Sequence, residues 1–263
     1  MTHGFAALLM YTAPDRLRAA NEAWLTRIVQ LLGIPRDPAA DDELMPLWLS
    51  SDLLLSQTCG YPLMTALRGK VRLIGRPDYR LPHSADGSHC SLLLARADDP
   101  RSGLEAFRGS HGLINNSDSN SGMNLFRHRL APFQRDGRFF HTVSLTGGHR
   151  ESMRWLREGR GDLAAVDSVT YDYLARDASA ELYGLRIIGR SASSPTLPYI
   201  GAVSLDADDA ERIRHGMNQA LKELPEVAAT LAIRSVMPAR EEDYQVLLDY
   251  QCEAEAMGLP VLI

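Results

Sequence analysis

The chain has 263 residues, which is enough for one large domain or two smaller lobes. Hydrophobic residues make up 45% and charged residues 23%, so the composition predicts a packed core and excludes a disordered chain. The net charge is -5 and no long basic run occurs, which argues against nucleic-acid binding, because that function needs a basic surface.

The cysteines and the apolar segments indicate a location. The chain has three cysteines, Cys59, Cys90 and Cys252, and they form no C-x-x-C motif. Three cysteines cannot all pair in disulfide bonds within the chain, which favours a reducing compartment. We find no signal-peptide pattern and no apolar run long enough to span a membrane. We therefore expect a cytoplasmic protein without direct membrane insertion, or a periplasmic one if a natural leader has been removed.

The first part of the chain alternates between apolar strands and helices. In chain order, the patterns predict a strand at 5–10, a helix ended by Gly33 and Pro35, a strand at 52–55, a helix at 63–67, a strand at 71–74 and a loop at 76–87. The run at 52–55 is typical of a buried parallel strand.

The alternation continues to the end of the chain. Strands are predicted at 90–95, 140–145, 163–166, 185–188 and 199–204, and helices at 104–109, 125–130, 151–158, 171–175, 210–224 and 241–256. This order predicts an α/β fold with mixed, mostly parallel sheets flanked by helices.

Four polar clusters follow predicted strands, at 56–61, 115–124, 146–150 and 167–170. In α/β sheets, ligands bind at the carboxyl ends of strands, near helix N-termini. The cluster at 115–124 has more hydroxyl and amide side chains than one helix cap needs, and a helix N-terminus suits an anion. An ordinary capping loop explains this stretch on its own, so the prediction of a binding site depends on the repetition of the pattern.

Four segments occur in the same order in one protein family. They are DLLLSQTCGYPL at 52–63, N-x-x-S-x-S-G at 116–122, TGGHR-x-S at 146–152 and DLAAVDSVT at 162–170. Together they resemble the phosphonate/phosphate-type substrate-binding proteins of ABC transporters, the PhnD-like branch of the type II periplasmic binding fold. The resemblance covers nearly the whole chain. It implies two lobes joined by a double crossover, with residues 1–88 and 191–263 in the first lobe and 89–190 in the second.

The resemblance also implies roles for individual residues. The family binds phosphonate-like anions with a Ser-x-Ser turn at a helix N-terminus, a histidine after a Thr-Gly turn and an acidic residue after a later strand. Those roles match Ser119 and Ser121, His149 and Asp167. The alternatives are that the serines and Asp167 only cap helices and that His149 faces water.

Five further residues complete the predicted ligand site. Asn116 and Asn120 lie in the serine motif, and Asn120 stands where phosphonate binders often have threonine, so the ligand could differ. Gln57 and Thr58 occupy the corresponding turn of the first lobe, and Tyr11 ends the first strand, where it packs on the ligand or lies at the rim.

Other classes of function have weaker support. Ser121, His149 and Asp167 are the residue types of a hydrolytic triad, but Ser121 lies outside a G-x-S-x-G turn. The histidines lack zinc-ligand spacing and no nucleotide-binding motif occurs, so we expect no metal and no cofactor.

The sequence thus predicts a protein that closes two lobes on a small, anionic, phosphonate- or phosphate-like solute. An ABC permease would be its partner if the protein is exported. The alternative is a cytoplasmic enzyme or ligand sensor on the same fold, acting on a small metabolite.

Overall fold

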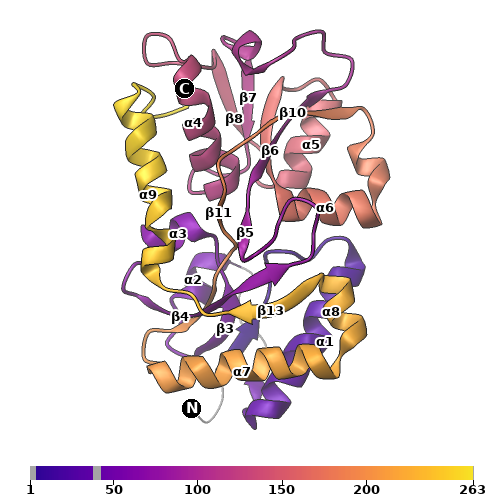
Figure 1. Cartoon of the computed structure of the whole chain (residues 1–263), viewed down its shortest axis with the longest axis vertical. Coiled ribbons are helices and arrows are strands. Elements are labelled where there is room, and N and C mark those ends of the chain that lie inside the picture. Colours follow the sequence, from indigo (N-terminus) through magenta and orange to yellow (C-terminus); the bar gives the residue numbers. More distant parts are fainter. Residues whose placement is uncertain (1–3, 38–42, 263) are drawn as a thin grey trace. The chain divides into compact units, whose positions relative to one another are not determined.

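The computed structural model describes residues 4–37 and 43–262 (Figure 1). Its contacts group the chain into a first unit, Met1–Ser88 with Pro195–Asp243, and a second unit, His89–Ser194 with Tyr244–Ile263. The chain therefore passes from one unit to the other three times. The parts of the predicted first lobe at 1–3, 38–42 and 263 lie outside the described residues.

The first unit contains one mixed sheet. In sheet order, its strands are β13 (Ile233–Met237), β4 (Val71–Tyr79), β12 (Tyr199–Ala202), β3 (Leu53–Gln57), β1 (Gly4–Ala7) and β2 (Arg36–Asp37). Strand β1 pairs in parallel with β2 and β3, and the other pairs are antiparallel. The helices are α1 (Asp15–Leu32), α2 (Leu44–Trp48), α3 (Gly60–Met64), α7 (Ala207–Glu223) and α8 (Pro225–Leu231).

Helix α1 follows directly from its sequence pattern. Leu17, Trp24 and Ile28 recur at helical spacing and are fully buried, and Gly33 ends the helix in the left-handed conformation, at φ 65°. The Trp24 indole N–H donates to the Met217 carbonyl of α7 at 3.1 Å. The two helices consequently pack side by side (Figure 1).

The second unit contains a five-stranded mixed sheet. In sheet order, its strands are β10 (Leu185–Arg190), β6 (Ser91–Arg96), β9 (Leu163–Asp167), β7 (His111–Ile114) and β8 (Thr142–Leu145). Strand β7 pairs in parallel with β8 and β9, whereas β6 is antiparallel to β9 and β10. The helices are α4 (Leu125–Leu130), α5 (His149–Arg157), α6 (Ser168–Asp177) and, from Tyr244 onward, α9 (Glu241–Ala256). A short π-helix, η2 (Asn120–Asn124), precedes α4. The strands β5 (Ser88–His89) and β11 (Ser194–Pro195) form a separate small sheet.

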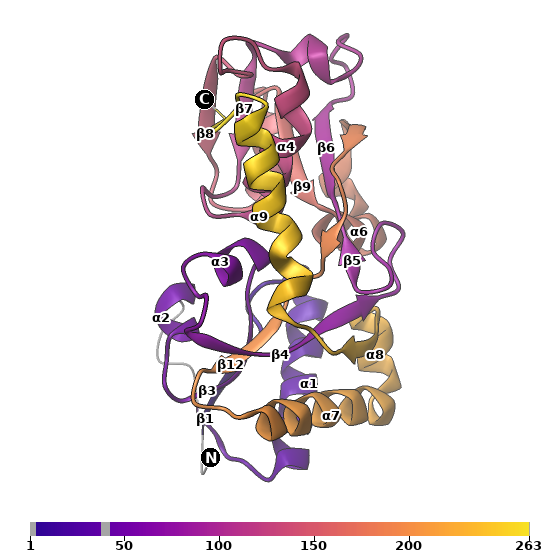
Figure 2. The same cartoon turned by 60° about the vertical axis from the view of Figure 1, so that its left-hand side comes forward.

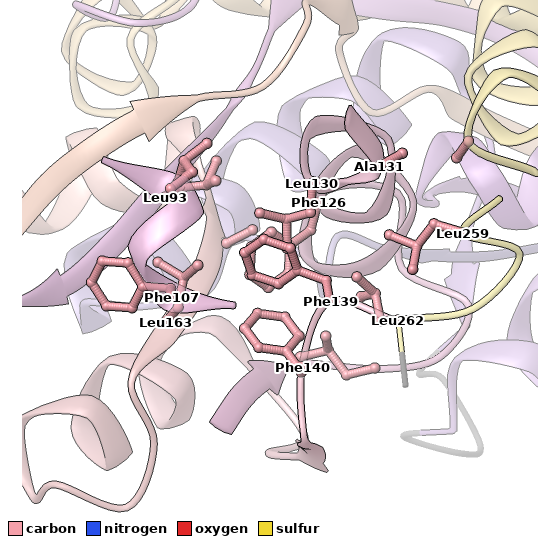
Figure 3. Close-up of a cluster of buried hydrophobic side chains, with 14 of the residues drawn as sticks. Leu93, Phe107, Phe126, Leu130, Ala131, Phe139, Phe140, Leu163, Leu259 and Leu262 are labelled. Atoms are coloured by element: carbon pink, nitrogen blue, oxygen red, sulfur yellow. The ribbon is translucent and has the colours of Figure 1, made fainter. Parts of the chain in front are cut away.

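An aromatic cluster fills the core of the second unit (Figure 3). The rings of Phe139 and Phe140 meet edge to face with their centroids 4.8 Å apart, and Phe126 lies 5.6 Å from Phe140. Leu259 and Leu262, from the end of the chain, belong to the same buried cluster.

The C-terminal segment therefore groups differently from the sequence-based division, which assigned all of residues 191–263 to the first lobe. Residues 191–194 and 244–263 belong to the second unit. The Asn124 side chain donates to the Leu247 carbonyl at 2.9 Å, and α9 runs beside α4 (Figure 2). Burial of the apolar C-terminal side chains against Phe126 and its neighbours accounts for this grouping.

Two local features differ from the sequence-based expectations. Strand β4 continues to Tyr79, into the predicted loop at 76–87, because β13 pairs with that part of it. The sequence pattern did not predict β13, and the parallel pairs do not outnumber the antiparallel ones among the described strands. The α/β class with mixed, helix-flanked sheets is confirmed.

No helix within residues 4–37 and 43–262 combines the length and the apolar character that crossing a bilayer requires.

Candidate functional site

The Ser-x-Ser motif opens η2 in the second unit. The Ser119 hydroxyl oxygen accepts from the Gly122 N–H at 3.0 Å, and the Ser119 carbonyl accepts from the Asn124 N–H at 3.0 Å. Ser119 is thus the N-cap of η2, and ligand binding by its hydroxyl group stays a prediction. Its hydroxyl hydrogen is not used by the cap, because the capping oxygen acts as an acceptor.

Gly122 is required by the packing of this turn. A Cβ atom at Gly122 would lie 1.8 Å from Asn115 Oδ1 and 3.2 Å from a ring carbon of His149. The glycine therefore allows the loop after β7 and the start of α5 to approach η2 closely.

The sheet register brings His149 to this turn. Strands β7 and β8 are parallel neighbours in which Ile114 is opposite Leu145, so both strands end at the same edge. The N–H groups of Thr146 and Gly147 donate to the carbonyls of Ile114 and Asn115, each at 2.9 Å. These bonds fix the turn that leads into α5, whose first residue is His149.

Ser121 and His149 form a direct pair. Ser121 Oγ lies 3.0 Å from His149 Nε2, within hydrogen-bond distance, and Ser121 is buried. Burial lowers the pKa of His149 below its ordinary value, and the nearby His89 acts in the same direction. Asp167 and the Ala165 carbonyl oppose that shift only in part.

Asp167 ends β9, and its two carboxylate oxygens contact different groups. Its Oδ1 accepts from the Thr170 N–H at 3.0 Å, which caps α6, and its Oδ2 lies 2.8 Å from His89 Nδ1. Burial alone would raise the pKa of this carboxyl group, but His89, His149 and the Thr170 N–H hold the pKa below its ordinary value. Asp167 is therefore a buried carboxylate paired with a buried histidine.

The two asparagines of the motif differ in their surroundings. Asn120 is buried, and its amide donates to Ser194 Oγ at 3.2 Å. Asn116 is exposed, and its Oδ1 accepts from the neighbouring Ser117 N–H at 2.8 Å. The structure thus places Asn120 inside the turn and Asn116 on its outer side.

Of the three predicted ligand residues of the first unit, Gln57 ends β3 and Thr58 follows it, whereas Tyr11 does not end the first strand as predicted, because β1 stops at Ala7. Gln57 and Thr58 are buried, with Gln57 Nε2 donating to the Leu197 carbonyl at 3.1 Å and Thr58 Oγ1 to the Cys59 carbonyl at 3.4 Å. The Tyr11 ring meets Tyr79 edge to face at 6.2 Å. Ligand binding by these three residues stays a prediction.

His89 is the main residue of this region that the sequence reasoning missed. Its ring is 1% exposed and pairs with a residue far away in sequence. The link comes from the antiparallel pairing of β6 with β9, in which Ser91 is opposite Asp167. A single histidine ahead of an apolar strand gave no signal of this pairing.

The same geometry bears on the hydrolase alternative. Ser121 and His149 are paired, but the carboxylate of Asp167 pairs with His89 and caps α6. The three residues therefore do not form the serine–histidine–aspartate relay in which the carboxylate orients the base. No group of three or more metal-ligating side chains occurs in the described part of the chain.

A family model matches residues 50–244, and its description is the periplasmic substrate-binding protein of phosphonate ABC transporters. The chain belongs to this family. The predicted membership and the predicted class of protein, a substrate-binding protein, are confirmed. No curated protein matches the sequence significantly.

Solved structures of similar fold are distant in sequence. The binding-protein component of an ABC phosphonate transporter from Pseudomonas aeruginosa is 15% identical, with a TM-score of 0.80, over 98% of this chain and 88% of that one. PhnD1 from Prochlorococcus marinus, solved with methylphosphonate, is 10% identical, with a TM-score of 0.78 and coverages of 97% and 98%. XAC2383 from Xanthomonas citri, solved with chloride, is 16% identical, with a TM-score of 0.72 and coverages of 98% and 99%. These likenesses establish the type II periplasmic-binding-protein fold.

Proposed function

We propose that this protein binds a small oxyanion of the phosphonate or phosphate kind and delivers it to an ABC transporter in the periplasm. The observation that carries the proposal is the Ser121–His149 pair at the start of η2, in a chain that belongs to the phosphonate-binding family. The Prochlorococcus relative was solved with methylphosphonate, which makes that compound the first ligand to test.

The chemistry of the turn fits an oxyanion. The first N–H groups of a helix have no partner inside the helix, and the helix dipole adds partial positive charge there. Ser119 and Ser121 add two hydroxyl groups, and both residues are buried, so contacts with a ligand would be shielded from water. We propose these two serines, with Asn120 and His149, as the residues of the second unit that bind the oxyanion. We propose Asp167 as a ligand residue for a hydroxyl or amino group of the ligand, because its own carboxylate would repel an anionic oxygen.

The remaining assignments are part of the same proposal. We retain Asn116, Tyr11, Gln57 and Thr58 as predicted ligand residues. Gln57 and Thr58 already make hydrogen bonds within the first unit, so binding through their side chains would have to exchange or share those bonds.

A thermal-shift screen tests the proposal. The protein is heated with methylphosphonate, phosphate, sulfate, chloride or a neutral amino acid, each at a concentration that is varied. A ligand present at about 100 times its dissociation constant adds roughly 2.7 kcal/mol to the free energy of unfolding. We expect a clear upward shift of the melting temperature with methylphosphonate or phosphate and none with the amino acid. A shift with the amino acid alone would contradict the proposal.

A further inference from the structure

Arg127 of α4 is a buried cation without a carboxylate partner. The residue is only 5% exposed, and an arginine side chain stays protonated, so burial takes a full positive charge out of water. Buried charges in proteins are usually balanced by an opposite charge. Among the described residues no ion pair includes Arg127, and Glu253 of α9 pairs instead with the neighbouring His128 at 2.7 Å.

The groups bonded to this guanidinium are neutral. Its Nη2 donates to Asn124 Oδ1 at 3.0 Å, and its Nη1 donates to the Pro260 carbonyl at 2.5 Å. Its Nε is buried and has no hydrogen-bond partner among the described residues. Two neutral dipoles do not cancel a full charge, so the positive field of Arg127 extends into the surrounding protein.

A buried chain of hydrogen bonds connects Arg127 with the proposed oxyanion turn. Asn124 is 0% exposed, and its Nδ2 donates to the Leu247 carbonyl at 2.9 Å and to Asn120 Oδ1 at 3.4 Å. Asn120 is itself buried and directly precedes Ser121. Arg127 follows Ser121 by six residues, which is about 9 Å along a helix. Charges at this distance are screened much less by buried protein than by water.

We infer that Arg127 is a specificity-determining residue, and that the bound oxyanion is the counter-charge of this buried guanidinium, acting through space rather than by contact. The inference rests on the proposed function. Two unit charges about 10 Å apart, at an effective dielectric constant of about 20, attract each other enough to change an affinity roughly tenfold. The same field acts twice as strongly on a dianion, which gives roughly 100-fold.

This field would rank ligands by their charge. In alkaline solution methylphosphonate is a dianion, whereas methanesulfonate is a monoanion with the same tetrahedral shape. The two compounds can make the same contacts with the serine turn but differ in their attraction to Arg127. The protein should therefore bind methylphosphonate more tightly than methanesulfonate, and removal of the Arg127 charge should narrow the difference between them.

Three substitutions separate the charge of Arg127 from its hydrogen bonds. Arg127→Gln removes the charge but keeps N–H donors for Asn124 and Pro260, and Arg127→Met removes the charge with a side chain that suits burial. Arg127→Lys keeps the charge. Arg129→Gln is the matched control, because Arg129 lies on the same helix but is partly exposed, donates to the Arg190 carbonyl at 3.1 Å and is screened by water. Thermal melting without ligand shows which variants fold.

The experiment is calorimetric titration in alkaline buffer, with methylphosphonate directly and with methanesulfonate by displacement. We expect Arg127→Gln and Arg127→Met to lose roughly 100-fold in affinity for methylphosphonate and roughly tenfold for methanesulfonate. At neutral pH, Arg127→Lys should bind methylphosphonate more tightly than Arg127→Gln does. Arg129→Gln should bind both anions within about threefold of the wild type.

The outcomes distinguish this inference from the proposed function. Unchanged affinity for methylphosphonate in a folded Arg127→Gln or Arg127→Met would overturn the inference alone. Equal losses for the two anions would also overturn it, because a distorted turn weakens both alike, as would an Arg127→Lys variant that binds as weakly as Arg127→Gln. A wild type that binds neither methylphosphonate nor phosphate would overturn the proposed function and this inference with it.

Discussion

The turns after β3 and after β7 have the same sequence pattern, a buried strand followed by polar residues and a helix, but they use their polar groups differently. In the first unit, Gln57 donates to the Leu197 carbonyl, and its own carbonyl accepts from the Trp48 indole at 3.1 Å. In the second unit, Ser121 pairs with His149, and the cap at Ser119 leaves a hydroxyl hydrogen unused. The pattern therefore identifies strand ends reliably, but the hydrogen-bond partners decide whether a turn holds the fold or is available to a ligand.

The largest expected effect comes from Gly122→Ala, which breaks the turn of the second unit. The new methyl group would collide with Asn115 Oδ1, so that loop or η2 has to move. We expect a loss of roughly 1–3 kcal/mol in the free energy of unfolding, measured by chemical denaturation, together with loss of ligand binding. Gly148→Ala is the matched control, because a Cβ at that position meets nothing within 4 Å. Equal stability of both variants would show that the close approach at Gly122 is not required.

Gln57→Leu tests the structural role of the turn in the first unit. The substitution leaves the Leu197 carbonyl, deep in the first unit, without its donor. We expect a loss of about 1–3 kcal/mol in the free energy of unfolding, measured by urea denaturation. A variant with wild-type stability but weakened ligand binding would reverse the comparison, since Gln57 would then serve the ligand.

A smaller effect is expected from the pH dependence of stability. The pKa of His149 is lowered by burial, so the unfolded state takes up a proton at a higher pH than the native state does. The contribution of neutral His149 to stability is therefore fully present above about pH 6.5, the ordinary histidine pKa, and is lost as the pH falls below that value. His149→Gln should flatten that part of a denaturation profile. A profile as steep as that of the wild type would show that His149 is not the group responsible.

Asn116→Ala should have the smallest effect on stability. Asn116 is exposed, and the described structure shows its side chain bonded to the next N–H of the same loop. We expect a change in the free energy of unfolding within about 0.5 kcal/mol in the absence of ligand. A larger loss would mean that the outer side of the turn also holds η2 in place.

The parts of the fold that could be predicted from the sequence are those with local causes. The periodic apolar residues and Gly33 predicted α1, and the apolar run before Gln57 predicted β3. Strand β13 escaped prediction because it alternates imperfectly, with exposed Arg234 beside buried Ile233 and a partly buried Ser235. Its pairing with β4 supplies the stability that its own pattern does not indicate.

The candidate site shows the same limit. Ser121 and His149 could be proposed because both lie in segments that resemble the family's motifs, each after a predicted strand, and the parallel pairing of β7 with β8 brings them together. The His89–Asp167 pair could not, because it depends on the antiparallel pairing of β6 with β9. The C-terminal grouping likewise depends on contacts between Leu259 and an aromatic cluster that is distant in sequence.

Calorimetric titration of methylphosphonate into the wild type and Ser121→Ala tests the central claim most directly. Ser102→Ala, an exposed serine of the same unit, is the control. We predict that Ser121→Ala binds roughly 10- to 100-fold more weakly than the wild type, as expected for the loss of a hydrogen bond to a charged group. Without ligand it should still fold, with a loss of about 1–3 kcal/mol in the free energy of unfolding because His149 Nε2 loses its partner. Equal affinity in the wild type and Ser121→Ala would contradict the account.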